Sequence, residues 1–375
     1  ALHGHHAGPG ISRRTLADGQ GAMESLVHLD FYRGKRVLVT GHTGFKGSWL
    51  IFWLHRLGAK VCGYALPPAT SPALYDCIGG DELCSSRIGD VSDFEGLRQV
   101  FDEFRPEIVI HLAAQAIVRE GYRAPRETYL SNVMGTVNLL ECVRLSEGVR
   151  SVLNVTTDKV YENKEWEWGY RETDVLDGYD PYSNSKSCSE LVTHSYRNSF
   201  LNERGVAVST ARAGNVIGGG DFSADRILPD CLRAAAAGRE IVVRNPFSVR
   251  PYQHVLEPLY AYLLIAAAQY EDPAKAGYYN VGPNEDDCRC TGALADIFVG
   301  AWGEGVRWVN KHDGGPHEAG FLKLDCSKIK KALGWRPRWH LDRAVEKTVE
   351  WEKCRLRGGD VRACMEKQIS EFMSR

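Results

Sequence analysis

The chain alternates short apolar runs with longer segments in which apolar residues recur at helical spacing. The apolar runs are rich in β-branched residues, are typical of strands, and lie at residues 36–40, 60–65, 108–112, 151–156 and 206–212. Helical periodicity covers the segments between them, at residues 48–57, 94–103, 132–145 and 181–203. Because parallel strands need crossover connections, this alternation predicts an α/β fold with a Rossmann-type, doubly wound parallel sheet.

Three glycines lie in the turn between the first predicted strand and the first predicted helix, in Gly41-His42-Thr43-Gly44-Phe45-Lys46-Gly47. In such a turn the first glycine permits the tight bend, the second lets a pyrophosphate approach, and the third allows close helix–strand packing. Glycines alone often serve only as turns, but the strand–turn–helix setting favours dinucleotide binding. We therefore expect NAD to contact Gly41, Gly44, Phe45, Lys46 and Gly47.

The choice between NAD and NADP stays open at this stage. The second predicted strand is followed by Leu66-Pro67-Pro68, without the acidic residue that usually binds the adenosine ribose, and Lys46 could meet a 2′-phosphate. Asp90, beside Val91, could bind the adenine amino group, or it could equally cap or turn the chain before a helix at Phe94. Further cofactor contacts are expected at the ends of later strands, from Leu112, Ala113, Ala114 and Thr156.

The regular alternation ends near Gly214, and loops rich in Gly, Pro, Asp and Arg follow. We expect residues 29–213 to form the NAD-binding Rossmann domain. Residues 214–375 are expected to form mainly a smaller α/β substrate-binding lobe, with elements such as a helix at residues 257–270 returning to the main sheet. Residues 1–28 are rich in Gly, His and Arg without periodicity, and we expect a disordered extension or an expression remnant there.

Composition excludes several classes of function. The net charge of −2 gives no basis for binding nucleic acid or an acidic membrane. The 11 cysteines are scattered without the spacing of a zinc site, so we expect reduced thiols and no metal. No apolar stretch is long enough to span a membrane and the N-terminus lacks a signal core, which predicts a cytoplasmic protein.

Two short segments carry an excess of acid and base groups. Tyr182 and Lys186 lie one helical turn apart, and a lysine ammonium beside a phenol is expected to lower the pKa of the phenol toward that of a working base. Thr157, Asp158 and Lys159 follow a predicted strand and add a hydroxyl, a carboxyl and an amine. Hydride transfer alone does not require the last two groups, which suggests that water is removed as well.

These motifs resemble the nucleotide-sugar 4,6-dehydratases of the extended short-chain dehydrogenase/reductase superfamily, and the resemblance covers about residues 31–350. Thr157-Asp158-Lys159-Val160-Tyr161 is similar to a Thr-Asp-Glu-Val-Tyr stretch of that family, with lysine in place of glutamate. The lysine, the glycine turn and the segment from Arg250 to Leu259 together resemble the branch of the family that acts on CDP-glucose.

The resemblance implies an NAD-dependent conversion of CDP-glucose to CDP-4-keto-6-deoxyglucose, in deoxysugar synthesis for cell-surface polymers such as O-antigen. In this scheme Tyr182, with Thr157, takes the proton of the C4 hydroxyl and hydride leaves C4. Asp158 then protonates the departing C6 hydroxyl while Lys159 removes the C5 proton, and hydride returns to C6. The alternative for Lys159 is electrostatic stabilisation of the enolate.

The resemblance also implies substrate contacts in the second half of the chain. Asn215, Arg226 and Arg250 match diphosphate- and nucleotide-binding positions, and arginine suits a diphosphate through paired, charge-assisted hydrogen bonds. Gln115 is expected at the sugar or nicotinamide end, and His317 in a segment that closes over the substrate. A homodimer or higher homo-oligomer is expected from the same resemblance.

Two other functions stay open. A 4-epimerase, or a dehydratase of a dTDP-, GDP- or UDP-sugar, would share the fold and the tyrosine–lysine pair. A non-catalytic dinucleotide-binding protein would need only the glycine turn. The joint presence of Thr157, Asp158, Tyr182 and Lys186 opposes the second alternative.

Overall fold

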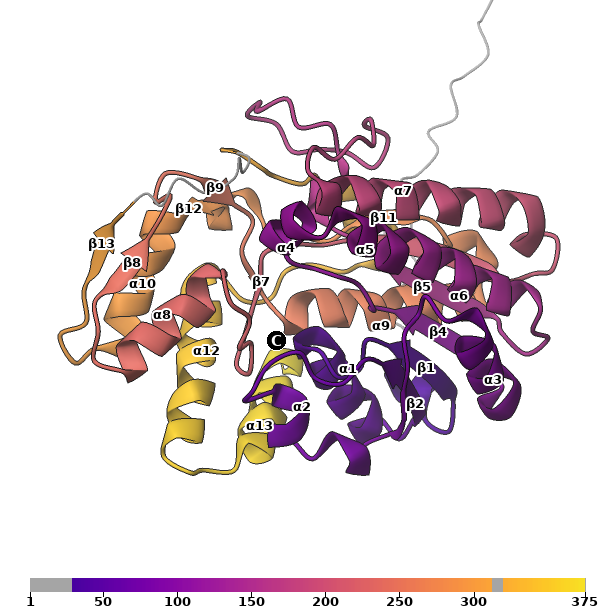
Figure 1. Cartoon of the computed structure of the whole chain (residues 1–375), viewed down its shortest axis with the longest axis horizontal. Coiled ribbons are helices and arrows are strands. Elements are labelled where there is room, and N and C mark those ends of the chain that lie inside the picture. Colours follow the sequence, from indigo (N-terminus) through magenta and orange to yellow (C-terminus); the bar gives the residue numbers. More distant parts are fainter. Residues whose placement is uncertain (1–28, 312–319, 375) are drawn as a thin grey trace, which may run out of the picture.

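The computed structural model describes residues 29–311 and 320–374, and its centre is a seven-stranded sheet (Figure 1). The strands follow the order β11-β6-β5-β4-β1-β2-β3, and every neighbouring pair is parallel. Their bounds are β1 (Arg36–Thr40), β2 (Lys60–Ala65), β3 (Ser85–Ile88), β4 (Ile108–His111), β5 (Ser151–Val155), β6 (Ala207–Arg212) and β11 (Tyr278–Asn280). The parallel, doubly wound sheet confirms the predicted fold class.

Helices cover both faces of this sheet because its strands are apolar on both sides. Val37 and Val39 of β1 join one buried cluster with α1 (Phe45–Arg56) and α9 (Leu256–Glu271). Leu38 points the other way, into a second cluster. The helices on that face are α3 (Phe94–Phe104), α6 (Gly135–Arg144) and α7 (Pro181–Tyr196).

Much of the chain after β6 forms a lobe beside the sheet (Figure 1). Its buried cluster lies between three helices, α8 (Ile227–Ala236), α10 (Thr291–Trp302) and α12 (Leu341–Leu356). Three two-stranded sheets pair β10 with β7, β12 with β9, and β13 with β8. These strands are β7 (Val216–Ile217), β8 (Ile241–Val243), β9 (Val249–Arg250), β10 (Gln253–His254), β12 (Arg289–Cys290) and β13 (Trp308–Asn310).

Two elements that follow residue 214 belong to the main sheet rather than to the lobe. The helix α9 packs on β4, β5 and β6, and β11 extends the sheet beyond β6. The remaining helices are α2 (Leu74–Cys77), α4 (Val118–Arg123), α5 (Pro125–Tyr129), α11 (Ser327–Leu333) and α13 (Val361–Met373). Residues 1–28, expected as an extension, lie outside the described part of the chain.

The predicted helices differ from the observed ones mainly at their ends. The first begins at Phe45 rather than at residue 48, because Gly44 of the glycine turn is itself the N-cap. The predicted helix at residues 132–145 starts regular geometry at Gly135, after a π-helical turn, η3 (Leu130–Met134). A similar turn, η5 (Arg197–Leu201), follows the end of α7 at Tyr196.

No helix within residues 29–311 or 320–374 has the length and apolar character needed to cross a membrane. All 11 cysteines lie in this part of the chain as free thiols.

Candidate active site

The glycine turn brings α1 close to the carboxyl end of the sheet. Gly41 has a φ of +75°, and a Cβ added there would lie 2.7 Å from the backbone nitrogen of Ala113. A Cβ on Gly47 would lie 2.1 Å from the carbonyl oxygen of Gly41. Around Gly44 the nearest heavy atom to such a Cβ is 3.4 Å away, and no side chain caps the helix that Gly44 begins. The turn therefore leaves the amides at the start of α1 available to an anion.

The segment after β4 packs against this turn. The amides of Leu112 and Ala113 donate to the Thr40 hydroxyl, at 3.1 and 3.2 Å. Asp90 accepts the amide of Ser92 at 2.8 Å and so closes a turn. The cap of α3 is Asp93, which accepts the amide of Gly96, so Asp90 does not cap that helix.

The structure changes the interpretation of Lys46. Its amine lies 3.4 Å from the Tyr262 hydroxyl on α9. Burial and the neighbouring charges of Lys186 and Arg226 lower the pKa of Lys46 to about 7. Lys46 therefore lies close to the charged groups of Lys186 and Arg226, and its contact with the cofactor stays a prediction.

The catalytic helix α7 is fixed at its start by Asp180, which accepts the amide of Ser183 at 3.0 Å. Tyr182 is 8% exposed, and Lys186, one turn later, donates to the carbonyl oxygen of Val155 at 3.1 Å. Burial raises the pKa of Tyr182 to about 12, partly offset by a hydrogen bond with Thr157. Burial also lowers the pKa of Lys186 to about 8.

The expectation that Lys186 lowers the pKa of Tyr182 is therefore wrong. Desolvation disfavours the phenolate, and the amine of Lys186 is directed at the end of β5 instead of at the phenol. The two residues do face the same side of α7, as their spacing predicts.

The carboxyl of Asp158 is fully buried and accepts hydrogen bonds from three groups. The Thr157 hydroxyl donates to Oδ1 at 3.0 Å and the Lys159 amine to the same oxygen at 3.1 Å. The Asn215 amide donates to Oδ2 at 2.7 Å. The Lys159 side chain is 28% exposed, so the ion pair lies at the boundary between protein interior and solvent. The predicted acid and base are thus in direct contact.

Sequence reasoning missed a buried ion pair beneath this site. Glu190 and Arg212 are fully buried, and two Arg212 nitrogens donate to the two Glu190 oxygens at 3.0 and 2.9 Å. The Thr156 hydroxyl also donates to Glu190. The positions Tyr182, Lys186 and Glu190 recur every four residues, and this polar stripe on a buried helix face was the available signal.

Two predicted substrate contacts are cationic side chains in the lobe. Arg226 pairs with Asp221 at 3.3 Å. Arg250 is buried, and its recorded hydrogen bond is to the carbonyl oxygen of Val249 at 3.0 Å. Among the residues that the structure describes, no carboxylate forms an ion pair with Arg250. A buried guanidinium without a carboxylate is suited to an anionic ligand.

The other predicted substrate residues are placed differently. Both ends of the Gln115 amide are engaged within the chain, with the Thr128 hydroxyl at 2.9 Å and the Ile117 amide at 2.6 Å. This favours a role in holding the loop after β4. Asn215 faces Asp158. His317 lies outside the described residues.

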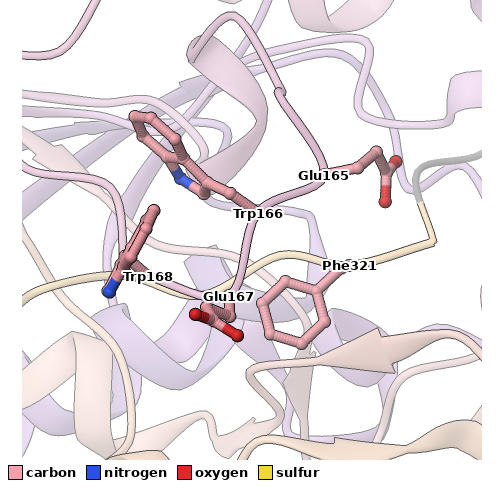
Figure 2. A pocket seen from close by; sticks show the side chains of 5 residues that line it. All are labelled: Glu165, Trp166, Glu167, Trp168 and Phe321. Atoms are coloured by element: carbon pink, nitrogen blue, oxygen red, sulfur yellow. The ribbon is translucent and has the colours of Figure 1, made fainter.

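A hollow outside the predicted site lies between the segment after Tyr161 and the chain near residue 321. Figure 2 shows the five side chains that line it, Glu165, Trp166, Glu167, Trp168 and Phe321. The carboxylate of Glu165 accepts the amide of Gly320 at 2.9 Å and holds the two segments together. None of these residues was a predicted site residue.

Comparisons with known proteins agree with this geometry. A family model described as GDP-mannose 4,6 dehydratase matches residues 38–348. A CDP-glucose 4,6-dehydratase of Salmonella typhimurium is 48% identical over 355 residues, which cover 93% of this chain and 99% of that protein.

Solved structures show the same fold. Thermus thermophilus UDP-glucose 4-epimerase in complex with NAD has a TM-score of 0.73 at 25% identity, covering 85% of this chain and 99% of that chain. A dTDP-glucose 4,6-dehydratase from Bacillus anthracis in complex with NAD has a TM-score of 0.72 at 20% identity, covering 87% and 99%.

The family match spans the glycine turn, the Thr157–Lys159 segment, the catalytic helix and Arg250. These matches confirm the family and the enzyme class that the motifs predict. The chain belongs to the nucleotide-sugar 4,6-dehydratases of the extended short-chain dehydrogenase/reductase superfamily.

Proposed function

We propose that this protein removes water from CDP-glucose to give CDP-4-keto-6-deoxyglucose, with NAD as a cofactor that is reduced and reoxidised in each turnover. The observation that carries the proposal is the contact of Asp158 with Lys159 at 3.1 Å beside the buried Tyr182. The high identity to a CDP-glucose 4,6-dehydratase supports the choice of nucleotide.

The glycine turn fits NAD. Gly41, Gly44 and Gly47 would hold its pyrophosphate at the start of α1, and Lys46 and Lys186 would lie toward its reactive end. Both amines have a lowered pKa, as expected of cations crowded into a buried site that is completed by an anionic ligand. NAD, when bound, accepts a hydride from sugar C4 and returns it to C6. No carboxylate follows β2 at residues 66–68 to mark the ribose site.

Tyr182 is the proposed base of the oxidation step. Its phenol shares a hydrogen bond with Thr157, so one proton path joins the C4 hydroxyl, the phenol and the threonine. Because burial holds the Tyr182 pKa near 12, ionisation needs added positive charge. Lys186 and Arg226 are two cations of the site that can supply it.

Asp158 and Lys159 are the proposed acid and base of the elimination step. As an ion pair they hold a carboxylate and an ammonium, neither of which has the protonation state that elimination requires. Transfer of one proton from the Lys159 amine to Asp158 Oδ1, across 3.1 Å, produces a neutral acid and a neutral amine together. The amine can then take the C5 proton while the acid gives its proton to the C6 hydroxyl that leaves as water.

The diphosphate of the substrate is proposed to lie between the main sheet and the lobe. Arg250 supplies a buried guanidinium there and Arg226 a second, partly exposed one. Both can form paired hydrogen bonds with phosphate oxygens.

An epimerase would use Tyr182 and Lys186 without the acid and base at positions 158 and 159. Supplying the protein with CDP-, dTDP-, GDP- and UDP-glucose, and following the alkaline absorbance of 4-keto sugars, tests substrate and reaction class together. We expect kcat/KM to be at least about tenfold higher for CDP-glucose, as a built nucleotide contact would give. Faster turnover of another nucleotide sugar would contradict the CDP assignment.

We further propose a homodimer that assembles in the cytoplasm. Apolar side chains are exposed on α7 and on the adjoining η3 turn. Leu191 is 53% exposed and Met134 is 45% exposed. An exposed apolar patch on packed helices is typical of a subunit interface. The free thiols support a reducing compartment.

A further inference from the structure

Asn215 occupies an unusual backbone position directly after β6. Its φ is +52°, in the left-handed region that asparagine tolerates better than most residues. Its carbonyl oxygen accepts the amide of Gln253 at 3.2 Å, which ties the residue to the start of β10. The side-chain amide then donates to Asp158 Oδ2 at 2.7 Å. The backbone is therefore fixed on one side and the amide is directed at the carboxyl on the other.

Gly214 provides the space for this contact. A Cβ added to Gly214 would lie 2.0 Å from Asp158 Oδ1 and 2.5 Å from Oδ2. Its φ lies outside the left-handed region, so the backbone conformation does not call for glycine. Glycine is needed because a side chain would clash with the Asp158 carboxyl. Gly214 and Asn215 together form a wall against which the Asp158 carboxyl rests.

The hydrogen bonds divide the two oxygens of Asp158 between two tasks. Oδ2 accepts a hydrogen bond from the neutral Asn215 amide, and Oδ1 accepts hydrogen bonds from the Thr157 hydroxyl and the Lys159 amine. Without the Asn215 amide, rotation of the carboxyl would bring either oxygen to Lys159. With it, the oxygen that faces the Lys159 amine is Oδ1.

We propose that Asn215 is a positioning residue for Asp158, and that Gly214 makes its contact possible, in place of the diphosphate contact expected from the sequence. The proposal rests on the proposed function, because it assigns Asn215 to the elimination step. The two roles predict different kinetic effects. Loss of a diphosphate contact raises KM, whereas loss of a residue that positions the acid slows elimination after C4 has been oxidised.

The test uses Asn215→Gly, which removes the amide and keeps the left-handed backbone free of strain. In single turnovers of the NAD-loaded protein with CDP-glucose, we expect C4 oxidation, seen as reduced nicotinamide, to keep its wild-type rate. The rate of water loss is expected to fall about 10- to 100-fold, as loss of a hydrogen bond to a charged group predicts. KM is expected to stay within about threefold of wild type.

A second substitution, measured as a function of pH, distinguishes a hydrogen bond to Asp158 from a purely structural role of Asn215. Asn215→Asp keeps the shape and tolerates the same backbone, but an ionised carboxyl cannot donate to Asp158. Beside Asp158 the pKa of the introduced carboxyl is expected to be raised, so it regains a proton as the pH falls. We therefore expect Asn215→Asp to recover water loss relative to Asn215→Gly when the pH is lowered.

Gly214→Ala should reproduce the selective loss of elimination, because its Cβ would displace the carboxyl. Gly300→Ala on α10 is the matched control, since a Cβ there meets no atom within 4 Å, and it should behave as wild type. A rise in KM of about tenfold with elimination unchanged in Asn215→Gly would overturn the proposal, as would equal losses in oxidation and elimination. Wild type that oxidises C4 without losing water would instead contradict the proposed function.

Discussion

At the scale of residues, the Asp158–Lys159 ion pair distinguishes this chain from an enzyme that only moves hydride. In the proposed mechanism the buried carboxyl and the partly exposed amine, 3.1 Å apart, exchange one proton before elimination. Sequence identifies the two residues because they follow a strand end in a dinucleotide-binding fold. The hydrogen bond from Asn215 to Asp158 joins residues 57 positions apart, so a local sequence pattern could not predict the wall formed by Gly214 and Asn215.

Substitution of Lys159 separates its two possible roles. Arginine keeps a positive charge but does not give up its proton at neutral pH, so it could stabilise an enolate and could not act as the C5 base. We expect Lys159→Arg to lose about as much elimination activity as Lys159→Met, on the order of 10²- to 10⁴-fold. C4 oxidation should persist in both variants, measured as reduced nicotinamide in a single turnover. Near-normal elimination in Lys159→Arg alone would assign Lys159 to charge stabilisation.

Burial explains the residue-scale errors. The spacing of Tyr182 and Lys186 correctly predicts a shared helix face, but the pKa of the phenol depends on how much solvent reaches it. Sequence periodicity carries no measure of that exposure. The buried Glu190–Arg212 pair was missed because its two members come from separate elements, whose pairing a local pattern does not show.

At the scale of elements, Glu257 joins the start of α9 to the chain before α12. Its Oε1 accepts the amides of Arg338 at 2.9 Å and Trp339 at 2.7 Å. Its other oxygen has no hydrogen-bond partner among the described residues. Burial raises the pKa of Glu257 to about 7 from an ordinary value of 4.5.

This shift makes the stability of the fold depend on pH. Between pH 4.5 and about 7 the unfolded chain has lost the Glu257 proton while the folded chain keeps it, so the free energy of unfolding falls as pH rises. Glu257→Gln removes this dependence. Relative to wild type, the variant is expected to gain roughly 2–3 kcal/mol between pH 5 and pH 7 in urea unfolding. Glu271→Gln, at the exposed end of α9, is the control. A difference in the free energy of unfolding between Glu257→Gln and wild type that does not change with pH would contradict the prediction.

Element types were more predictable than element ends. Long periodic segments such as α3 and α9 lie within two residues of their predicted bounds. Short strands escaped notice: Tyr278-Tyr279-Asn280 forms the edge strand β11 from only three residues. Such strands are fixed by pairing with their neighbours, which a local pattern does not record.

At the scale of the whole molecule, the sheet brings four strand ends to one place. The glycine turn follows β1, the Leu112–Ala114 segment follows β4, and the Thr157–Lys159 segment follows β5. Gly214 and Asn215 follow β6. Because β1, β4, β5 and β6 are consecutive in the parallel sheet, residues far apart in sequence share one edge. The fold class therefore predicts this edge as the location of the site. The lobe beside the sheet, built from short and irregular elements, was predictable only as a region.

The proposed dimer is testable on its outer helical face. Leu191→Glu places a charge in the proposed interface and should convert a dimer to a monomer at low micromolar protein, measured by light scattering. Leu356→Glu, on α12 in the lobe, is the control, because Leu356 is 47% exposed on a different face. An unchanged mass for Leu191→Glu would place the interface elsewhere.

The most direct test of the central claim follows one hydrogen atom. CDP-glucose deuterated at C4 is converted by the NAD-loaded protein, and the position of the label in the product is read by NMR and mass spectrometry. The account predicts a 4-keto-6-deoxy product with deuterium at C6, since the hydride removed from C4 returns after water has left. Deuterium that returns to C4 in an epimerised sugar, or a 6-deoxy product without deuterium at C6, would contradict it.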